Sequence, residues 1–268
     1  MKLAGACVII TGGSQGIGLA TARAFGRAGA RVALAARGAE QLEAAAKSIR
    51  ERVAECPQVL ALPCDVADGE AVRRAFEEVL RAMGRMDVLV NNAGVSLYGE
   101  AEATPVDAVR KVMEVNYFGA VNCIAAVLPV MRKQGSGVIV NVASVAALHG
   151  VPFLAAYGAT KAALVSYSQS LRAELHGSGI DLATVYPGYT ETELFSKEEV
   201  YGAVHRPAGP YDSPETVAEA IVEAVRRRRT EVVLSRDGRR LALARRLAPW
   251  LVEVAMVRLA KALRDGQR

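Results

Sequence analysis

A tyrosine and a lysine stand four residues apart in the sequence YGATK at 157–161. Because residues i and i+4 share one face of a helix, we expect the Lys161 ammonium beside the Tyr157 phenol. A free phenol titrates near ~10, and a neighbouring cation lowers its pKa toward neutrality by favouring the phenolate. The pair therefore predicts an acid–base group, although a surface lysine beside a half-buried tyrosine has the same spacing.

Further polar groups follow apolar runs elsewhere in the chain. Ser144 lies thirteen residues before Tyr157, directly after the run 138–143, and the sequence NNAG at 91–94 follows another such run. In a doubly wound sheet the carboxyl ends of the strands form the ligand crevice, so we expect these side chains near Tyr157. Asn116 interrupts a long helical pattern, which indicates either a buried polar role or a helix bend.

Glycines at 12, 16 and 18 punctuate the sequence TGGSQGIG, residues 11–18. At a junction of strand and helix, this GxxxGxG spacing permits a tight turn, close approach of the backbone to a pyrophosphate, and close packing of the helix on the strand. The free N–H groups and the positive dipole at the start of a helix attract phosphate. The turn predicts a nucleotide site, with a purely structural glycine turn as the alternative.

The segment Ala35-Ala36-Arg37 ends the second apolar run and contains no carboxylate. A site for NAD usually places a carboxylate there to bind the ribose 2′-hydroxyl, whereas a guanidinium suits a 2′-phosphate. NADP(H) is therefore favoured over NAD(H), with an exposed arginine at the start of a helix as the alternative. Asp65, after the third run, either accepts a hydrogen bond from adenine or caps a helix that begins at Ala67.

Short β-rich runs and longer helical patterns alternate along the chain. This order predicts βαβ crossovers and a single doubly wound α/β domain of the Rossmann type, with a mostly parallel seven-stranded sheet over residues 1–235. The strands are expected at 7–11, 31–36, 59–64, 87–91, 137–143, 180–186 and 231–235. The helices are expected at 16–29, 38–54, 68–83, 105–133, 155–176 and 213–229.

The segment 236–268 is expected to be a basic helical extension. From Arg226 onward the chain has 13 Lys or Arg against four Asp or Glu, a local net charge of +9 compared with +5 for the whole chain. At helical spacing one face carries Val252, Ala255, Met256, Leu259 and Leu263, and the opposite face is charged but includes Trp250 and Val254. Such a helix suits packing on the domain or a sister subunit, a lid over an apolar pocket, or docking on an anionic membrane.

Composition excludes several classes of protein. The chain of 268 residues is 51% hydrophobic and 23% charged, which is too apolar for a disordered protein. Its four cysteines are scattered without ligand spacing, so we expect free thiols, no metal site and a cytoplasmic location. The C-terminal extension allows this cytoplasmic protein a peripheral contact with the inner face of a membrane. The basic tail has one aromatic residue and no recognition motif, so we expect no nucleic-acid partner.

Together, TGxxxGxG, NNAG, the mid-helix Asn, the strand-end Ser and YxxxK resemble the short-chain dehydrogenase/reductase family over roughly residues 5–235. The resemblance implies that Tyr157 is the general acid for carbonyl reduction and the base for alcohol oxidation. It implies that Lys161 lowers the pKa of Tyr157 and binds the nicotinamide ribose. Ser144 would hold the substrate oxygen, and Asn116 would anchor a water that extends the proton relay.

The resemblance also implies a homodimer or homotetramer and a set of cofactor-binding residues. The extension departs from the usual family ending and puts the usual tetramer in doubt. The implied cofactor-binding residues are Gly12, Ser14, Gln15, Gly16, Ile17, Gly18, Arg37, Asp65, Val66, Asn92, Ala93, Gly94, Tyr157, Lys161, Pro187, Gly188, Thr190 and Thr192.

The substrate is expected between the segments 145–154 and 189–211, the second of which is long enough to act as a flap. Their apolar side chains, among them Leu148, Val151, Phe153, Leu194, Phe195 and Tyr201, suit a hydrophobic ketone or secondary alcohol. Some lipid-acting relatives, such as 3-ketosphinganine reductases, carry similar extensions, which favours a long-chain substrate. The expected activity is NADP(H)-dependent hydride transfer to or from such a substrate. A non-catalytic cofactor-sensing protein on the same fold is the alternative.

Overall fold

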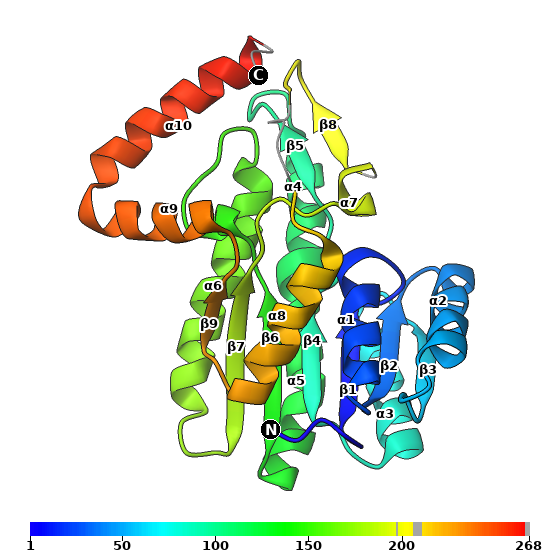
Figure 1. The fold of residues 1–268 in the computed structure, drawn as a ribbon. Helices are drawn as coiled ribbons and strands as arrows, with labels where there is room; N and C mark the ends of the chain where they lie inside the picture. Colours follow the sequence, from blue (N-terminus) through cyan, green and yellow to red (C-terminus); the bar gives the residue numbers. More distant parts are fainter. Residues whose placement is uncertain (197, 206–210, 266–268) are drawn as a thin grey trace.

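The computed structural model describes residues 1–196, 198–205 and 211–265, apart from the side chains of Phe195 and Ser196. Residues 197 and 206–210 of the predicted flap and residues 266–268 of the extension lie outside this description, as does the predicted substrate contact of Phe195. Within the described residues, seven parallel strands form a sheet in the order β3-β2-β1-β4-β6-β7-β9 (Figure 1). The strands are β1 (Cys7–Thr11), β2 (Arg31–Ala36), β3 (Val59–Pro63), β4 (Val88–Asn91), β6 (Gly137–Val142), β7 (Ile180–Tyr186) and β9 (Glu231–Val233).

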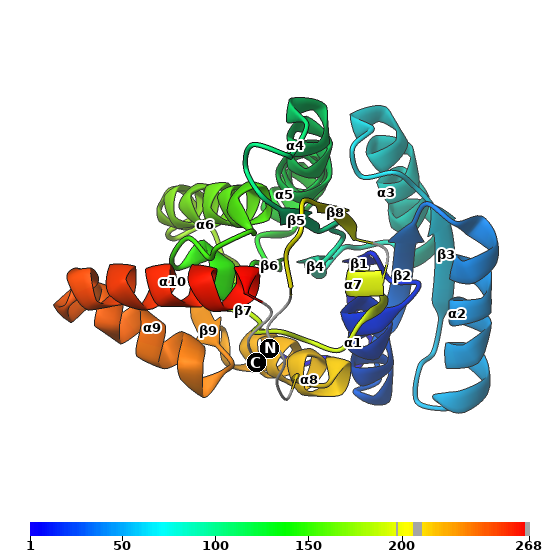
Figure 2. The ribbon, with the colours of Figure 1, turned by 90° about the horizontal axis from the view of Figure 1, so that it is seen from above.

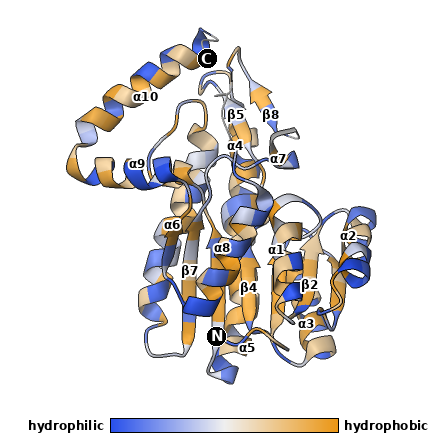
Figure 3. Cartoon of the chain, viewed as in Figure 1, coloured by the Kyte–Doolittle hydropathy of each residue, from blue (hydrophilic) through white to orange (hydrophobic). Residues whose placement is uncertain are grey.

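Helices cover both faces of the sheet, as the Rossmann-type prediction requires (Figure 2). Side chains alternate across each strand, so β1 directs Val8 and Ile10 into one core and Cys7 and Ile9 into the other. The first core is closed by α1 (Gly16–Arg27), α2 (Ala39–Arg52) and α8 (Pro214–Arg227), and the second by α3 (Gly69–Met83), α5 (Gly119–Gln134) and α6 (Ala155–Glu174). Because both faces of the sheet are covered, the strands consist mostly of apolar residues (Figure 3).

One predicted helix, 105–133, is interrupted. The structure has α4 (Val106–Met113), a π-helical turn at Glu114–Phe118 and then α5. The buried Asn116 lies in that turn, which confirms the expected buried polar role; the helical path changes there to a π-helical turn. The continuous helical segment 106–134 is long and apolar enough to cross a membrane. One face of this segment packs in the second core, where Cys123 and Val127 are completely buried.

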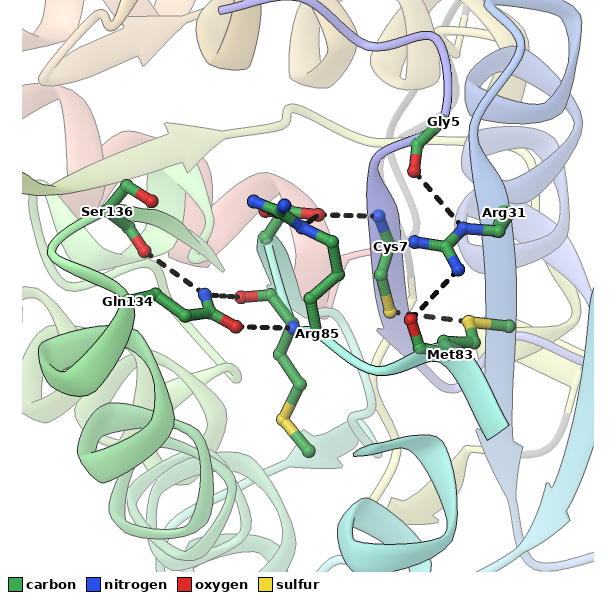
Figure 4. A network of polar contacts seen from close by, with 9 residues as sticks. Gly5, Cys7, Arg31, Met83, Arg85, Gln134 and Ser136 are labelled. Atoms are coloured by element: carbon green, nitrogen blue, oxygen red, sulfur yellow. Dashed lines mark hydrogen bonds and ion pairs between the residues drawn. The ribbon is translucent and has the colours of Figure 1, made fainter. Parts of the chain in front are cut away.

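Polar side chains fasten the amino ends of the strands, at the edge opposite the strand carboxyl ends (Figure 4). The Arg31 guanidinium donates hydrogen bonds to the carbonyl oxygens of Gly5 and Met83, at 3.1 and 2.9 Å. The buried Asp87 carboxylate accepts the backbone N–H of Cys7 at 2.9 Å. These contacts join β1, β2 and the start of β4, and none of them involves the carboxyl edge.

Three short elements above the carboxyl edge were not predicted. β5 (Leu97–Gly99) and β8 (Glu199–Tyr201) pair in parallel as a separate two-stranded sheet. A short helix, α7 (Glu193–Ser196), precedes β8 in the chain. Strands of three residues are too short to produce a readable alternation. The pairing holds the described part of the 189–211 segment against the loop after β4.

The extension forms two helices, α9 (Arg236–Leu247) and α10 (Pro249–Arg264), with a corner at Ala248. Pro249 is the first residue of α10, a position where its missing N–H costs no hydrogen bond. Val252 and Leu263, from the predicted apolar face, are buried, and Leu263 packs in one cluster with Phe153. The corner between α9 and α10 projects from the body of the protein (Figures 1 and 2).

Candidate active site

A cleft of about 500 Å³ opens at the carboxyl edge of the sheet. It is lined by the segments that follow β1, β2, β3, β4, β6 and β7, together with the start of α6. The cleft brings together most of the predicted site residues: Gly12, Ser14, Gln15, Gly16, Ile17, Arg37, Asp65, Val66, Asn92, Ala93, Gly94, Ser144, Tyr157, Lys161, Pro187, Gly188, Thr190 and Thr192. Gly18 and Asn116 do not line the cleft but lie directly behind its wall.

The glycine-rich turn has the geometry of a phosphate cradle. Gly12 and Gly16 have φ angles of +65° and +52°, in the region that favours glycine. At Gly18 an added Cβ would lie 2.1 Å from the Gly12 carbonyl oxygen, so α1 can approach the turn only with glycine there. The turn leads directly into α1, and the N–H groups and positive dipole at the start of a helix attract anions. This turn fits the pyrophosphate of a dinucleotide.

Thr11 fastens the glycine-rich turn to the turn after β4. Its hydroxyl accepts the backbone N–H groups of Asn92 and Ala93, both at 3.0 Å, and its carbonyl oxygen accepts the Asn92 side-chain amide at 3.0 Å. Thr11 is a positioning residue that the sequence analysis did not single out. A threonine at the end of an apolar strand is too common to signal such a role without knowledge of the neighbouring strand.

The Tyr157–Lys161 pair lies in the first two turns of α6, as its spacing predicts. The Lys161 ammonium lies 5.9 Å from the centre of the Tyr157 ring and donates a 2.9 Å hydrogen bond to the carbonyl oxygen of Val142, the last residue of β6. Ser144, two residues further on, hydrogen-bonds the Tyr157 phenol and accepts the N–H of Ala146 at 3.2 Å. The end of β6 therefore holds both members of the pair.

Asn116 forms three hydrogen bonds next to the Tyr157–Lys161 pair, on the side away from the cleft. Its side-chain oxygen accepts the Val95 N–H at 2.8 Å, and its amide donates to the Val95 carbonyl at 2.9 Å and to the Thr160 hydroxyl at 3.0 Å. An added Cβ at Gly94 would lie 3.2 Å from this oxygen and 3.6 Å from the Lys161 nitrogen. Asn116 thus joins the π-helical turn, the loop after β4 and the helix that carries Lys161.

Burial dominates the electrostatics of the pair. Desolvation raises the pKa of Tyr157 to about 12, against the lowering effect of the Ser144 hydrogen bond, and the nearby Tyr189 adds to the rise. Desolvation also lowers the pKa of Lys161 to about 8. In this structure desolvation outweighs any lowering of the Tyr157 pKa by Lys161, because the buried ammonium donates its hydrogen bond to the Val142 carbonyl oxygen and not to the phenol. At neutral pH the phenol is protonated and can act as an acid.

Arg37 and Asp65 lie where β2 and β3 end. Arg37 is exposed at the edge of the cleft and, in the part of the chain that the structure describes, has no ion-pair partner. Asp65 faces the cleft while its carboxylate accepts the Ala67 N–H at 3.0 Å. The alternative that Asp65 caps a helix at Ala67 is wrong, because α3 begins at Gly69 and is capped by Asp68.

Beyond Tyr157 the cleft is lined mainly by apolar side chains, together with Ser96 and the Lys111–Glu199 ion pair of 2.9 Å. Val151 and Leu194 line it as predicted, whereas Leu148, Phe153 and Tyr201 do not. Phe153 instead packs against Tyr98 and Leu263, beneath α10. The wall also includes side chains that the sequence analysis missed, Leu97, Ala108, Val112 and Val115, because they belong to β5, α4 and the π-helical turn.

The chain resembles known proteins along most of its length. The family model of the short chain dehydrogenases matches residues 6–200. The dehydrogenase/reductase SDR family protein 7-like protein of Drosophila melanogaster is 35% identical over 274 residues, which cover 100% of this chain and 84% of that protein. The structure of a short chain dehydrogenase from Burkholderia cenocepacia in complex with NADP has a TM-score of 0.81 at 26% identity and covers 96% of this chain and 99% of that one. A short chain dehydrogenase/reductase from Burkholderia phymatum in complex with NAD has a TM-score of 0.82 at 25% identity, with 94% and 96% covered.

Proposed function

Because the chain belongs to the short-chain dehydrogenase/reductase family and is an NAD(P)-dependent oxidoreductase, we propose that it uses NADP(H) to interconvert a carbonyl and a secondary alcohol in a hydrophobic substrate. The observation that carries the proposal is the convergence of Tyr157, Ser144 and Lys161 beside the glycine-rich turn, in a cleft whose far wall is mainly apolar. A spectrophotometric screen of NADPH and NADH with ketones of increasing chain length tests it. Oxidation of NADPH that rises with chain length is expected, and no turnover with any ketone would contradict it.

The protein's residues supply orientation and a proton. A nicotinamide cofactor supplies the hydride when bound, and the turn with Gly12, Gly16 and Gly18 would hold its pyrophosphate. Ser144 holds the substrate oxygen by a hydrogen bond, and Tyr157 donates its phenolic proton to that oxygen during reduction. Lys161 would hold the nicotinamide ribose, and its ammonium would place a positive charge near the phenolate that remains. In alcohol oxidation the phenolate takes the proton back.

Asn116 has a positioning role in this proposal. Its hydrogen bonds to Val95 and Thr160 fix the wall behind Lys161. A water bound beside Asn116 would return a proton to Lys161 after Lys161 has passed its own proton toward Tyr157. The remaining residues of the predicted cofactor set line the cleft and would contact the adenine, ribose and nicotinamide portions.

Preference for NADP(H) rests on Arg37, and Arg37→Ala is expected to weaken NADPH binding about 10- to 100-fold while changing NADH binding little. The reason is the loss of charge-assisted hydrogen bonds that only the 2′-phosphate can accept. Fluorescence titration of both cofactors measures the effect, and Arg81→Ala, at an exposed position of α3, is the matched control. Equal losses for NADPH and NADH would overturn the preference.

The rate of carbonyl reduction is expected to fall as pH rises through about 8. Lys161, whose pKa is lowered to about 8, loses its charge there, whereas Tyr157, with a pKa of about 12, keeps its proton. The profile of kcat/KM for NADPH between about pH 6 and pH 10 reports the free enzyme and measures this fall. In Lys161→Arg the guanidinium stays charged, because its pKa exceeds ~12, so the fall near pH 8 is expected to vanish whatever the absolute rate. If kcat/KM of the wild type and of Lys161→Arg fell in the same way near pH 8, Lys161 would not be the group whose titration causes the fall.

We also assign residues 1–235 to the catalytic domain and 236–268 to the extension, and we propose a cytoplasmic homodimer or homotetramer without a nucleic-acid partner. Family membership and the continuous Rossmann-type sheet support the first assignment. Light scattering after size-exclusion chromatography measures the oligomeric state, and a monomer at working concentrations would overturn it.

A further inference from the structure

Exposed apolar side chains are concentrated on the two C-terminal helices. Within the described residues, ten large hydrophobic side chains are exposed, and six of them lie on α9 and α10. Trp250 and Leu247, at the corner, are 63% and 68% exposed. The six are Leu243, Leu247, Trp250, Leu251, Val254 and Val257, and together we call them the corner patch.

The corner patch is not needed to attach α10 to the domain. Val252 and Leu263 are buried, and Leu259, on the same side of the helix, packs in the cluster of Leu263 and Phe153. At 100° per residue, Trp250 and Val254 point to the opposite side. The corner itself projects beyond the sheet and α6 (Figures 1 and 2). α10 therefore has two apolar faces, one that packs on the protein and one that faces outward.

Cations surround the corner patch. Residues 236–265 contain eight Arg or Lys and three Asp or Glu. Arg246 precedes the corner, and Arg258 and Lys261 lie among the outward apolar side chains of α10. Arg246 and Arg258 are exposed and form no ion pair within the described residues. Exposed leucine, valine and tryptophan interleaved with arginine and lysine match a surface that is apolar inside and anionic outside.

We propose that the corner patch docks the protein on an anionic lipid bilayer, with Leu247, Trp250 and Leu251 inserted at the level of the headgroups. Tryptophan suits this depth because its ring is apolar and its N–H is polar. A second copy of this chain fits less well, because a two-fold contact through the patch would place its surplus of cations against the same surplus. A nucleic acid would satisfy the cations but would leave the aliphatic side chains without an apolar partner.

Docking by this surface has a consequence for substrate access, which rests on the proposed function. The inner face of α10 packs on the loop before α6: Leu263 contacts the cluster of Phe153 and Leu154, and the Arg264 guanidinium lies 5.8 Å from the centre of the Phe153 ring. Leu154 and Val151 of that loop line the apolar end of the cleft. The same loop also reaches the corner, where the Arg245 guanidinium donates a hydrogen bond to the Leu148 carbonyl oxygen and Glu253 lies 3.7 Å from His149. A bilayer at the corner patch would therefore meet the protein next to the loop that lines the apolar end of the cleft.

The single tryptophan of the chain makes docking measurable at the site itself. On mixing with phosphatidylglycerol/phosphatidylcholine vesicles, the emission of Trp250 is expected to shift to shorter wavelength, and the protein is expected to float with the vesicles. Phosphatidylcholine vesicles alone are expected to bind at least about tenfold more weakly, and added salt is expected to weaken binding. Unchanged emission with no flotation would overturn the proposal.

Two variants and one control separate the apolar and the cationic contributions. Leu247→Glu and the pair Arg246→Glu/Arg258→Glu are each expected to weaken vesicle binding at least about tenfold. Val106→Glu, at a position on α4 that is 63% exposed, is the matched control and is expected to bind as the wild type does. Undiminished NADPH binding by all three variants shows that they are folded and keeps this test separate from the enzyme assignment.

The rival partners give different results. If Leu247→Glu dissociates an oligomer and wild-type protein does not bind vesicles, a second copy covers the patch and the proposal is overturned. It is likewise overturned if duplex DNA binds in an Arg246- and Arg258-dependent manner while Leu247→Glu has no effect on any binding.

Discussion

The variant Tyr157→Phe is expected to lose about 10²- to 10⁴-fold in kcat for carbonyl reduction, the range that a positioned general acid supplies. The phenol is the group in the cleft that hydrogen-bonds Ser144 and holds a proton at neutral pH, because burial raises its pKa to about 12. Removal of the hydroxyl leaves the ring, and therefore the packing of α6, in place. NADPH affinity is expected to change little, since the glycine-rich turn and Arg37 are untouched. Stopped-flow single turnovers and equilibrium titration measure the two quantities.

Tyr167→Phe is the matched control for this variant. Tyr167 lies on the same helix, outside the cleft, and its ring contacts Tyr117 edge to face with centres 6.1 Å apart. The same chemical change there is expected to leave kcat within about twofold, as for a surface substitution. Near-normal turnover by Tyr157→Phe would show that the Tyr157 phenol is not the general acid.

Gly18→Ala is expected to abolish useful affinity for both cofactors and to destabilise the fold. The added methyl would lie 2.1 Å from the Gly12 carbonyl oxygen and 2.7 Å from the Asn92 amide nitrogen. Backbone cannot yield as a side chain does, so α1 must shift away from the turn that would hold the pyrophosphate. Overpacking of this kind costs about 1–3 kcal/mol, and we expect at least a tenfold rise in the Kd of NADPH and of NADH.

Gly150→Ala is the matched control, because it replaces a glycine at a position where the added methyl causes no steric clash. A Cβ at Gly150 meets no atom within 4 Å, and its φ lies outside the left-handed region. Its thermal unfolding midpoint and its NADPH affinity are expected to stay near the wild-type values. If Gly18→Ala binds NADPH normally, the first turn of α1 is not the phosphate site.

The sequence was sufficient to predict the sheet and the assembly of the cleft, because both follow from local signals. Continuous apolar runs mark buried parallel strands, and polar residues at their carboxyl ends must meet at one edge. This is why Ser144, Tyr157 and the glycine-rich turn, far apart in sequence, were expected to lie together.

Three features could not be predicted in this way, because each depends on groups brought together by the fold. The pKa of Tyr157 follows burial more than it follows the neighbouring Lys161, and burial is a property of the assembled cleft. Leu97 lies on β5, which pairs with β8 about one hundred residues away, and Val112 of α4 packs against Leu97; both line the cleft. The corner patch could be resolved only when Val252 and Leu263 were seen to occupy the inner face of α10.

The bonds of Arg31 to Gly5 and Met83, and of Asp87 to Cys7, lie at the rim of the sheet farthest from the chemistry. The contacts that hold the strands together and the proposed active site are thus at opposite edges of the sheet. Loops at the carboxyl edge can be exchanged, lengthened or redesigned for new substrates without disturbing the contacts at the amino edge. We expect this chain to tolerate such loop grafting well, and to make a practical scaffold for laboratory evolution of new reductases.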